Sequence, residues 1–275
     1  MTDKKNVFSA AQADLEAAED LHNLPQTRSP SYRLAFADTD LMLRDELRGV
    51  RLELELLKAD LALEDAEIES TIVVFGSARA PSPENVDESG HDPRSEDYHE
   101  ARRFAKLVAE SPLSDGQRYV IATGGGEGIM EAANRGAYEA GDPTIGFNIV
   151  LKTEQIPNPY ITPDLCFQFH YFGLRKMHLL MRAKALVCFP GGYGTLDELF
   201  ETLTLIQTGK VAPMPVLLYR SAWWKQMINF DMLVAEGMIS PEDMGIFQYV
   251  ESAEEAWKIV CNFDVPSDTP HEAIR

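Results

Sequence analysis

The residues best suited to chemistry lie in the segment Pro190-Gly-Gly-Tyr-Gly-Thr-Leu-Asp-Glu198, which follows a short apolar run. Its glycines have no Cβ atom, so several backbone N–H groups can point at one anion. These glycines are Gly191, Gly192 and Gly194. Thr195 adds a hydroxyl at the start of a predicted helix, and a helix N-terminus favours negative charge. The segment therefore predicts a site for the phosphate of a mononucleotide.

Glu198 is the carboxylate of this segment that could act on a sugar attached to such a phosphate, because it lies about one helical turn into the predicted helix. A second interpretation fits the spacing equally well. Thr195-Leu-Asp-Glu198 is also the pattern of a capping box, in which Glu198 would only bind a backbone N–H. Asp197 cannot face the same ligand as Glu198, since consecutive helical residues point about 100° apart.

A second glycine-rich segment, residues 123–131, joins a predicted strand to a predicted helix. It is not a dinucleotide fingerprint, because position 129 is Ile, and it lacks the Gly-Lys-Ser/Thr of a Walker loop. Its glycines at a helix start favour contact with phosphate or ribose, and a simple packing turn is the alternative. The candidate contacts are Gly125, Gly126 and Met130.

Two further features are expected at the same edge of the fold. Gly76 and Ser77 directly follow a predicted strand, although such a pair alone is weak evidence for a ligand. Arg175 and Lys176 begin a helix that leads into the strand before Pro190, and such a helix starts near the carboxyl edge of a parallel sheet. The basic pair is therefore a candidate for holding an anion, and a solvated surface pair is the alternative.

Short apolar runs alternate with helical patterns from position 71 onwards, and this predicts an α/β fold with an open parallel sheet covered by helices on both faces. Loops that follow parallel strands meet at one edge of such a sheet, where ligands bind. The predicted strands are Thr71–Phe75, Tyr119–Ala122, Thr144–Phe147, Leu165–Tyr171, Ala185–Phe189 and Pro215–Tyr219. The predicted helices are Tyr98–Ala109, Gly128–Ala140, Arg175–Lys184 and Thr195–Gln207.

This nucleotide-binding catalytic domain is predicted over residues 70–263, after an N-terminal helical extension. Residues 1–37 are expected to form a flexible acidic arm with a short helix near Ala10–Leu21, and residues 264–275 a loose tail. Residues 38–69 predict a long amphipathic helix, because apolar residues from Leu43 to Ile68 recur at alternating steps of four and three, with one break at Glu64. That helix could pack on its own domain or form a subunit interface.

Composition narrows the function classes further. The 275 residues carry a formal net charge of −19, which argues against a broad nucleic-acid footprint. No apolar run is long enough for a membrane span, and no secretory signal is visible, so a cytoplasmic protein is expected. Three widely spaced cysteines and isolated histidines predict neither a disulfide framework nor a metal site.

The motifs at 123–133 and 190–198, together with Arg175-Lys176, resemble the Lonely Guy family of cytokinin-activating phosphoribohydrolases. Gly76-Ser-Ala-Arg79 and Asn158-Pro-Tyr-Ile-Thr-Pro-Asp-Leu-Cys166 are similar to its bacterial branch, whose members are described as nucleotide phosphoribohydrolases or AMP nucleosidases. The resemblance covers roughly residues 70 to 225 and is weaker at both ends of the chain. Older descriptions call such proteins lysine decarboxylases, but the sequence shows no context for a pyridoxal-binding lysine.

The resemblance implies a Rossmann-like fold, a homodimer or larger homo-oligomer, and no cofactor. It implies hydrolysis of the N-glycosidic bond of a nucleoside 5′-monophosphate, with Arg175 and Glu198 in the catalytic positions and Gly191 to Thr195 at the phosphate. Plant-like members have Met four residues after the Arg, where this chain has Leu179, so the base preference stays open.

The expected reaction converts AMP, or an N6-substituted AMP such as a cytokinin riboside monophosphate, to free base and ribose 5-phosphate. The alternative is a non-catalytic carrier or sensor that holds a nucleotide or the molybdenum cofactor in the same crevice. The pair Arg175 and Glu198 distinguishes the hydrolase from the carrier, since a carrier needs the glycine loops but not the carboxylate.

Overall fold

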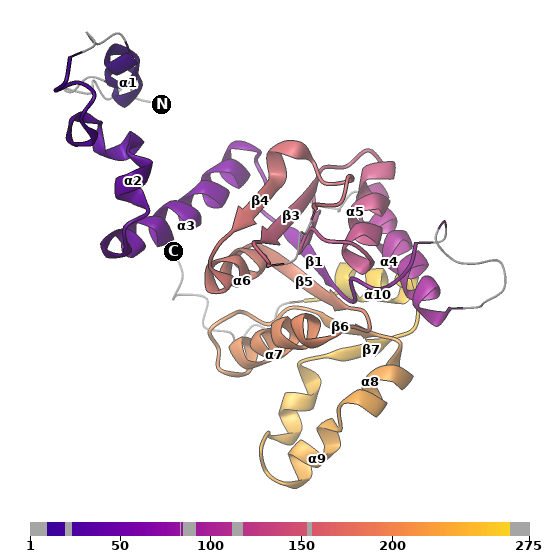
Figure 1. Cartoon of the computed structure of the whole chain (residues 1–275). Coiled ribbons are helices and arrows are strands. Elements are labelled where there is room, and N and C mark those ends of the chain that lie inside the picture. Colours follow the sequence, from indigo (N-terminus) through magenta and orange to yellow (C-terminus); the bar gives the residue numbers. More distant parts are fainter. Residues whose placement is uncertain are drawn as a thin grey trace. The chain divides into compact units, whose positions relative to one another are not determined.

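The computed structural model describes residues 10–19, 24–82, 84, 92–111, 118–152 and 156–264. Within these residues, seven parallel strands form one sheet in the order β4-β3-β2-β1-β5-β6-β7 (Figure 1). The predicted α/β class with an open parallel sheet is thus confirmed. The strands are β1 (Thr71–Phe75), β2 (Val120–Thr123), β3 (Thr144–Ile149), β4 (Cys166–Phe169), β5 (Ala183–Cys188), β6 (Val216–Tyr219) and β7 (Gln248–Val250).

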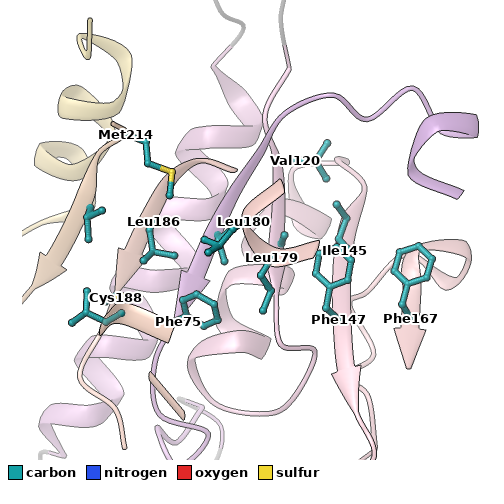
Figure 2. Packing of buried hydrophobic residues seen from close by; sticks show 14 of the residues in the cluster. Phe75, Val120, Ile145, Phe147, Phe167, Leu179, Leu180, Leu186, Cys188 and Met214 are labelled. Carbon is teal, nitrogen blue, oxygen red and sulfur yellow. The ribbon is translucent and has the colours of Figure 1, made fainter. Parts of the chain in front are cut away.

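Helices cover both faces of the sheet, and successive residues of β1 show this directly. Ile72 and Val74 pack into one apolar cluster with residues of α4 (Pro93–Glu110), α5 (Ile129–Glu139) and α10 (Ala253–Cys261). Val73 and Phe75 pack into a second cluster with residues of α6 (Phe172–Met181), α7 (Tyr193–Gln207) and the end of α3 (Arg48–Asp65). Figure 2 shows part of this second cluster, including Phe75 and Leu179. A parallel strand buried on both sides has to be apolar throughout, which explains the continuous apolar runs of the sequence.

The main helices of this part are α4 (Pro93–Glu110), α5 (Ile129–Glu139), α6 (Phe172–Met181), α7 (Tyr193–Gln207), α8 (Ser221–Met227), α9 (Phe230–Ala235) and α10 (Ala253–Cys261). Short 3₁₀ turns lie at Pro163–Leu165 and Pro241–Gly245. Local sequence explains where α4 begins. The Asp92 side chain accepts a hydrogen bond from the N–H of Arg94 at 2.9 Å, and Pro93 occupies the first helical position.

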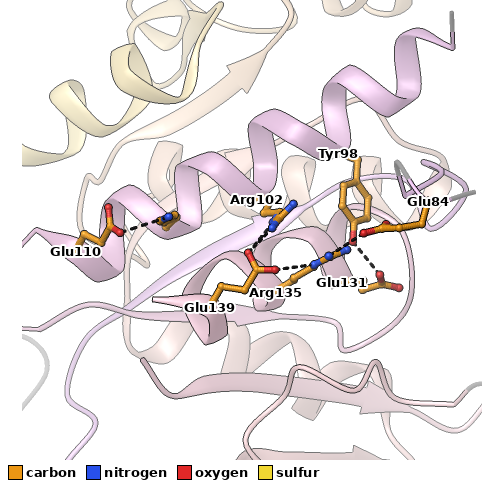
Figure 3. Close-up of polar contacts among 8 residues, drawn as sticks. Glu84, Tyr98, Arg102, Glu110, Glu131, Arg135 and Glu139 are labelled. Atoms are coloured by element: carbon orange, nitrogen blue, oxygen red, sulfur yellow. Dashed lines mark hydrogen bonds and ion pairs between the residues drawn. The ribbon is translucent and has the colours of Figure 1, made fainter. Parts of the chain in front are cut away.

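A network of charged and hydroxyl side chains joins α4 to α5 (Figure 3). The buried Tyr98 hydroxyl of α4 donates to Glu131 of α5 at 2.8 Å. Arg102 of α4 and Arg135 of α5 both bind Glu139, at 2.7 Å and 2.9 Å. We call these five residues the α4–α5 network. It fixes the helix that follows the second glycine-rich segment.

The N-terminal part of the chain, to Glu55, forms a separate compact unit. It contains α1 (Ala11–Glu19), α2 (Thr39–Met42), the start of α3 (Arg48–Asp65) and 3₁₀ turns at Pro30–Tyr32, Ala35–Ala37 and Asp45–Leu47. The helical pattern of residues 38–69 is therefore divided into three pieces. Asp38 caps the start of α2, accepting from the N–H groups of Asp40 and Leu41, and α2 ends at its C-cap Leu43. The extended backbone of Arg44, with φ −65° and ψ 147°, then separates α2 from the turn at Asp45–Leu47.

The end of α3 belongs to the larger unit and presents two different faces there. Ala59 and Leu63 are buried in the core, whereas Leu57 and Leu61 are exposed. Of the predicted terminal tail, residues 265–275 lie outside the described residues, as do residues 1–9 of the arm. Among the helices of the described ranges, none has the length and apolar character to cross a membrane.

Candidate active site

A pocket of about 790 Å³ opens at the carboxyl edge of the sheet. Its wall comes from the loops after β1, β5 and β6 and from the first turns of α4, α5, α6 and α7. This is where ligands bind in open parallel sheets. The structure brings together there nine of the residues predicted from sequence: Gly76, Ser77, Met130, Arg175, Gly191, Gly192, Gly194, Thr195 and Glu198.

The loops after β1, β2 and β5 are tied to one another through the main chain of Ser77. Its N–H donates to the carbonyl of Pro190 at 3.0 Å, and its carbonyl accepts from the N–H of Ile129 at 3.1 Å. Gly76 has to be glycine, since a Cβ there would lie 2.7 Å from Ile129. Gly76 and Ser77, although only weakly indicated by the sequence, thus connect the three loops that form this edge of the pocket.

Helix α7 begins earlier than the capping-box interpretation requires. Its N-cap is Gly192 and its first residue is Tyr193, so Thr195 lies inside the first turn. A Cβ on Gly191 would overlap the Thr195 side chain, which packs directly against this glycine. No side chain of the described residues caps the helix, and its first N–H groups have no partner within the helix itself. The arrangement suits a phosphate group.

Glu198 is buried, with 5% of its surface exposed, on the second turn of α7. Burial raises the pKa of its carboxyl to about 7, although the positive charges of Arg175 and Lys176 act in the opposite direction. Within the described part of the chain, no hydrogen bond reaches this carboxylate. A carboxyl group that titrates near neutral pH at the wall of a pocket can both accept and release a proton there.

Arg175 is held next to Glu198 by contacts with strand β3 and with the loop after β2. Its Nε donates to the carbonyl of Phe147 in β3 at 2.9 Å. Its guanidinium lies so close to Gly124 that a Cβ at that position would collide with it. Burial lowers the pKa of Arg175, and the charge of Glu198 opposes this. A fixed guanidinium facing a buried carboxylate can orient both the carboxylate and a polar substrate.

The structure does not bring Gly125, Gly126 or Lys176 to the pocket wall. The N–H of Gly125 donates to the Thr123 hydroxyl at 3.0 Å, and the carbonyl of Gly126 accepts from the Asn158 side chain at 3.0 Å. The second glycine-rich segment therefore packs on the protein and shapes the wall behind Arg175 and Met130.

Lys176 instead forms ion pairs with Asp197 and Glu201, both at 2.9 Å. It follows Arg175 on the same helix, and a rotation of about 100° per residue turns it toward α7. Its positive charge still acts on Glu198 from there. Among the described residues, no group of three or more His, Cys, Asp or Glu side chains could hold a metal ion.

The wall also contains residues that sequence reasoning missed, chiefly Asp97 of α4, Arg220 after β6, and Trp223 and Met227 of α8. For Arg220 a signal existed, because it directly follows a predicted strand and so had to lie at the same edge as the glycine loops. For Asp97 there was none, since it belongs to an ordinary helical pattern of alternating polar and apolar residues.

Comparisons with known proteins support the motif analysis. A family model described as "Possible lysine decarboxylase" matches residues 130–260. A probable cytokinin riboside 5′-monophosphate phosphoribohydrolase of Oryza sativa subsp. japonica is 30% identical over 145 residues, which are 50% of this chain and 64% of the relative. A cytokinin riboside 5′-monophosphate phosphoribohydrolase of Arabidopsis thaliana is 31% identical over 144 residues, 50% of this chain and 65% of the relative.

The chain thus spans less than two thirds of the length of these curated relatives. Among solved structures, the molybdenum cofactor binding protein from the phototrophic bacterium Rippkaea orientalis matches with a TM-score of 0.47 and 19% identity, covering 70% of this chain and 95% of that protein. The resemblance to the Lonely Guy family that the glycine motifs predicted is confirmed over about half of the chain.

Proposed function

We propose that this protein hydrolyses the N-glycosidic bond of a nucleoside 5′-monophosphate, AMP or an N6-substituted AMP, to the free base and ribose 5-phosphate. The observation that carries the proposal is Glu198, a buried carboxyl group with a pKa of about 7 on the helix that begins at the predicted phosphate site. The names of the curated relatives support the same reaction class.

The phosphate would bind at the N-terminus of α7, where Gly191 and Gly192 leave the backbone open and Thr195 lies in the first turn. Binding there holds a part of the substrate that does not react. The binding energy is used to place the anomeric carbon of the ribose beside Glu198.

Cleavage develops positive charge on the ribose ring as the bond from the anomeric carbon to the base nitrogen breaks. The ionised Glu198 stabilises that charge and takes a proton from the attacking water, whose oxygen forms the new bond to the anomeric carbon. The base leaves with the bonding electron pair and gains a proton. Arg175 fixes the position of the Glu198 carboxylate, and its positive charge favours the ionised form of that group.

The test is to incubate purified protein with a panel of nucleoside 5′-monophosphates and to measure free base by chromatography. We expect release of adenine from AMP, no release by Glu198→Gln, and substantial turnover by Glu201→Gln. Glu201 is a matched control because it lies on the same helix but outside the pocket wall.

Two results would overturn the proposal. Turnover by Glu198→Gln comparable to that of the unchanged protein would remove Glu198 from the chemistry. Tight binding of nucleotides without release of base from any of them would favour a carrier or sensor.

A further inference from the structure

Asp97 and Arg220 form a charged pair in the pocket wall that the proposed chemistry does not use. Nη1 of Arg220 lies 3.2 Å from Oδ1 of Asp97, whose side chain is only 3% exposed. Among the described residues, this oxygen has the ion pair but no hydrogen-bond partner. Buried carboxylate oxygens are normally hydrogen-bonded, so an unsatisfied one in a pocket wall calls for a donor from elsewhere.

The backbone at Arg220 indicates that its side chain is needed in this position. Arg220 has φ 67° and ψ 74°, in the left-handed region that costs free energy for residues with a Cβ atom. Its N–H donates to the carbonyl of Val250 at 2.9 Å, and its carbonyl accepts from the N–H of Trp223 at 3.0 Å. Glycine would adopt this conformation without cost, but it could not reach Asp97 or a ligand.

The chemistry of the pair selects one kind of ligand group. Arg220 offers N–H donors, and Asp97 offers a carboxylate acceptor beside them. A phosphate would be attracted by Arg220 but repelled by Asp97. A group with an N–H donor next to an acceptor satisfies both, and the edge of an amino-substituted nucleobase is such a group.

The surroundings suit a base as well. Trp223 and Met227 of α8 line the same pocket and provide an apolar surface for a planar ring. Arg220 follows β6, which is the neighbour of β5, so it lies about one strand spacing, ~4.8 Å, from the strand that leads to the phosphate site.

Burial raises the pKa of the Asp97 carboxyl to about 6, with Glu96 and Asp92 adding to the effect and Arg220 opposing it. The group is therefore mostly ionised, and a pure acceptor, above neutral pH.

We propose that Asp97 and Arg220 recognise the base of the nucleotide. Asp97 accepts a hydrogen bond from the exocyclic amino group, and Arg220 donates one to the adjacent ring nitrogen. This inference rests on the proposed function and narrows its substrate to bases with an N–H beside a ring nitrogen acceptor, as in adenine. A singly substituted N6 still carries one such hydrogen. A 6-oxo base such as hypoxanthine would turn an oxygen toward the carboxylate and is disfavoured.

The experiment compares AMP with IMP for the unchanged protein, Asp97→Asn and Arg220→Gly. We expect Asp97→Asn to lower kcat/KM for AMP by about 10- to 100-fold, mainly through KM, because a buried hydrogen bond to a charged group is lost. Its amide can turn an NH₂ group toward a 6-oxo base, so the preference for AMP over IMP should shrink by at least tenfold.

Arg220→Gly tests the donor side of the pair. We expect it to lose the preference for AMP, with kinetic constants compared per folded molecule. Its Tm should fall, because glycine relieves the left-handed backbone but the change leaves the buried Asp97 carboxylate without its ion pair. Glu67→Gly is the matched control. Glu67 also has a positive φ, of 56°, and lies outside the pocket wall, so this change should leave both kinetic constants unaltered.

An unchanged ratio of AMP to IMP activity in both pocket variants would overturn the inference and leave the proposed function standing. If the unchanged protein releases no base at all, the proposed function fails, and calorimetric titration with AMP and IMP still decides the inference. Tighter binding of AMP that is lost in Asp97→Asn would support it. Equal binding of the two nucleotides, or no binding, would overturn it.

Discussion

The α4–α5 network and the pocket wall differ in how they hold their carboxylates. Arg135 of the network binds Glu139 and also Glu84, which precedes α4, and its hydrogen bond lowers the pKa of the exposed Glu84 carboxyl to about 2. In the pocket, burial dominates and raises the pKa of Glu198 to about 7. It also raises the pKa of Asp97, even beside Arg220. Burial, more than the presence of an arginine, therefore decides which carboxyl group can exchange a proton near neutral pH.

The largest effect that this comparison predicts is the loss of turnover in Glu198→Gln. We expect a fall of about 10³-fold or more, since general acid–base groups contribute on this scale. The Tm should not fall, because the change removes a buried charge and leaves no hydrogen bond broken. Base release and thermal unfolding of the same preparation provide the measurement. A lower Tm with normal turnover would place Glu198 with the structural carboxylates.

The next largest effect is expected for Gly191→Ala. The added Cβ collides with Thr195 at the predicted phosphate site, so kcat/KM should fall by about 100-fold through misplacement of the substrate. Steady-state kinetics and thermal unfolding measure the change. For stability, Gly192→Ala is the control, because a Cβ there meets no atom within 4 Å. Equal Tm values for the two variants would contradict the packing described here.

A third effect concerns stability and pH. The pKa of the Glu198 carboxyl is about 7 in the folded state, compared with 4.5 in the unfolded chain. The folded protein therefore binds more protons between these values, and its stability should decrease as pH rises through 7. Glu198→Gln lacks this dependence, so its stability relative to the unchanged protein should increase by about 2 kcal/mol from pH 5 to pH 8. Urea unfolding at both pH values tests this, and parallel curves would refute it.

The smallest effect is expected in the α4–α5 network. Tyr98→Phe removes the hydroxyl that donates to Glu131, so the free energy of unfolding should fall by about 1 kcal/mol. Turnover per folded molecule should stay the same, because the hydroxyl lies between two helices rather than in the pocket wall. A change in KM without loss of stability would mean that the network belongs to the active site.

The sequence predicted six of the strands and four helices at the pocket, α4 to α7, because parallel strands buried on both faces and amphipathic helices leave clear patterns. It did not predict α8, a helix of seven residues that also lines the pocket. It did not predict β7, whose three residues, Gln248–Val250, include a single buried one. It predicted a single helix over residues 38–69, where the extended backbone at Arg44 and the turn at Asp45–Leu47 divide the structure into shorter pieces.

Within the site, the type of loop was predictable, but the direction of each side chain was not. Whether Thr195 and Glu198 formed a capping box depended on the start of α7: the box needs Thr195 as the N-cap, and the N-cap is Gly192, three residues earlier. Spacing alone cannot resolve such a shift. Gly125 and Gly126 were expected at a ligand, but the loop uses its N–H and carbonyl groups on Thr123 and Asn158 instead.

The main chain of Ser77 has a consequence for how ligand binding spreads through the molecule. Because it is bonded to the loop after β5 on one side and to the start of α5 on the other, the three loops cannot shift independently. A nucleotide that touches only the α7 terminus should therefore slow hydrogen exchange at the amides of Ser77 and Ile129 as well. Hydrogen exchange at these two amides would therefore report that the pocket is occupied, even by compounds that are never cleaved.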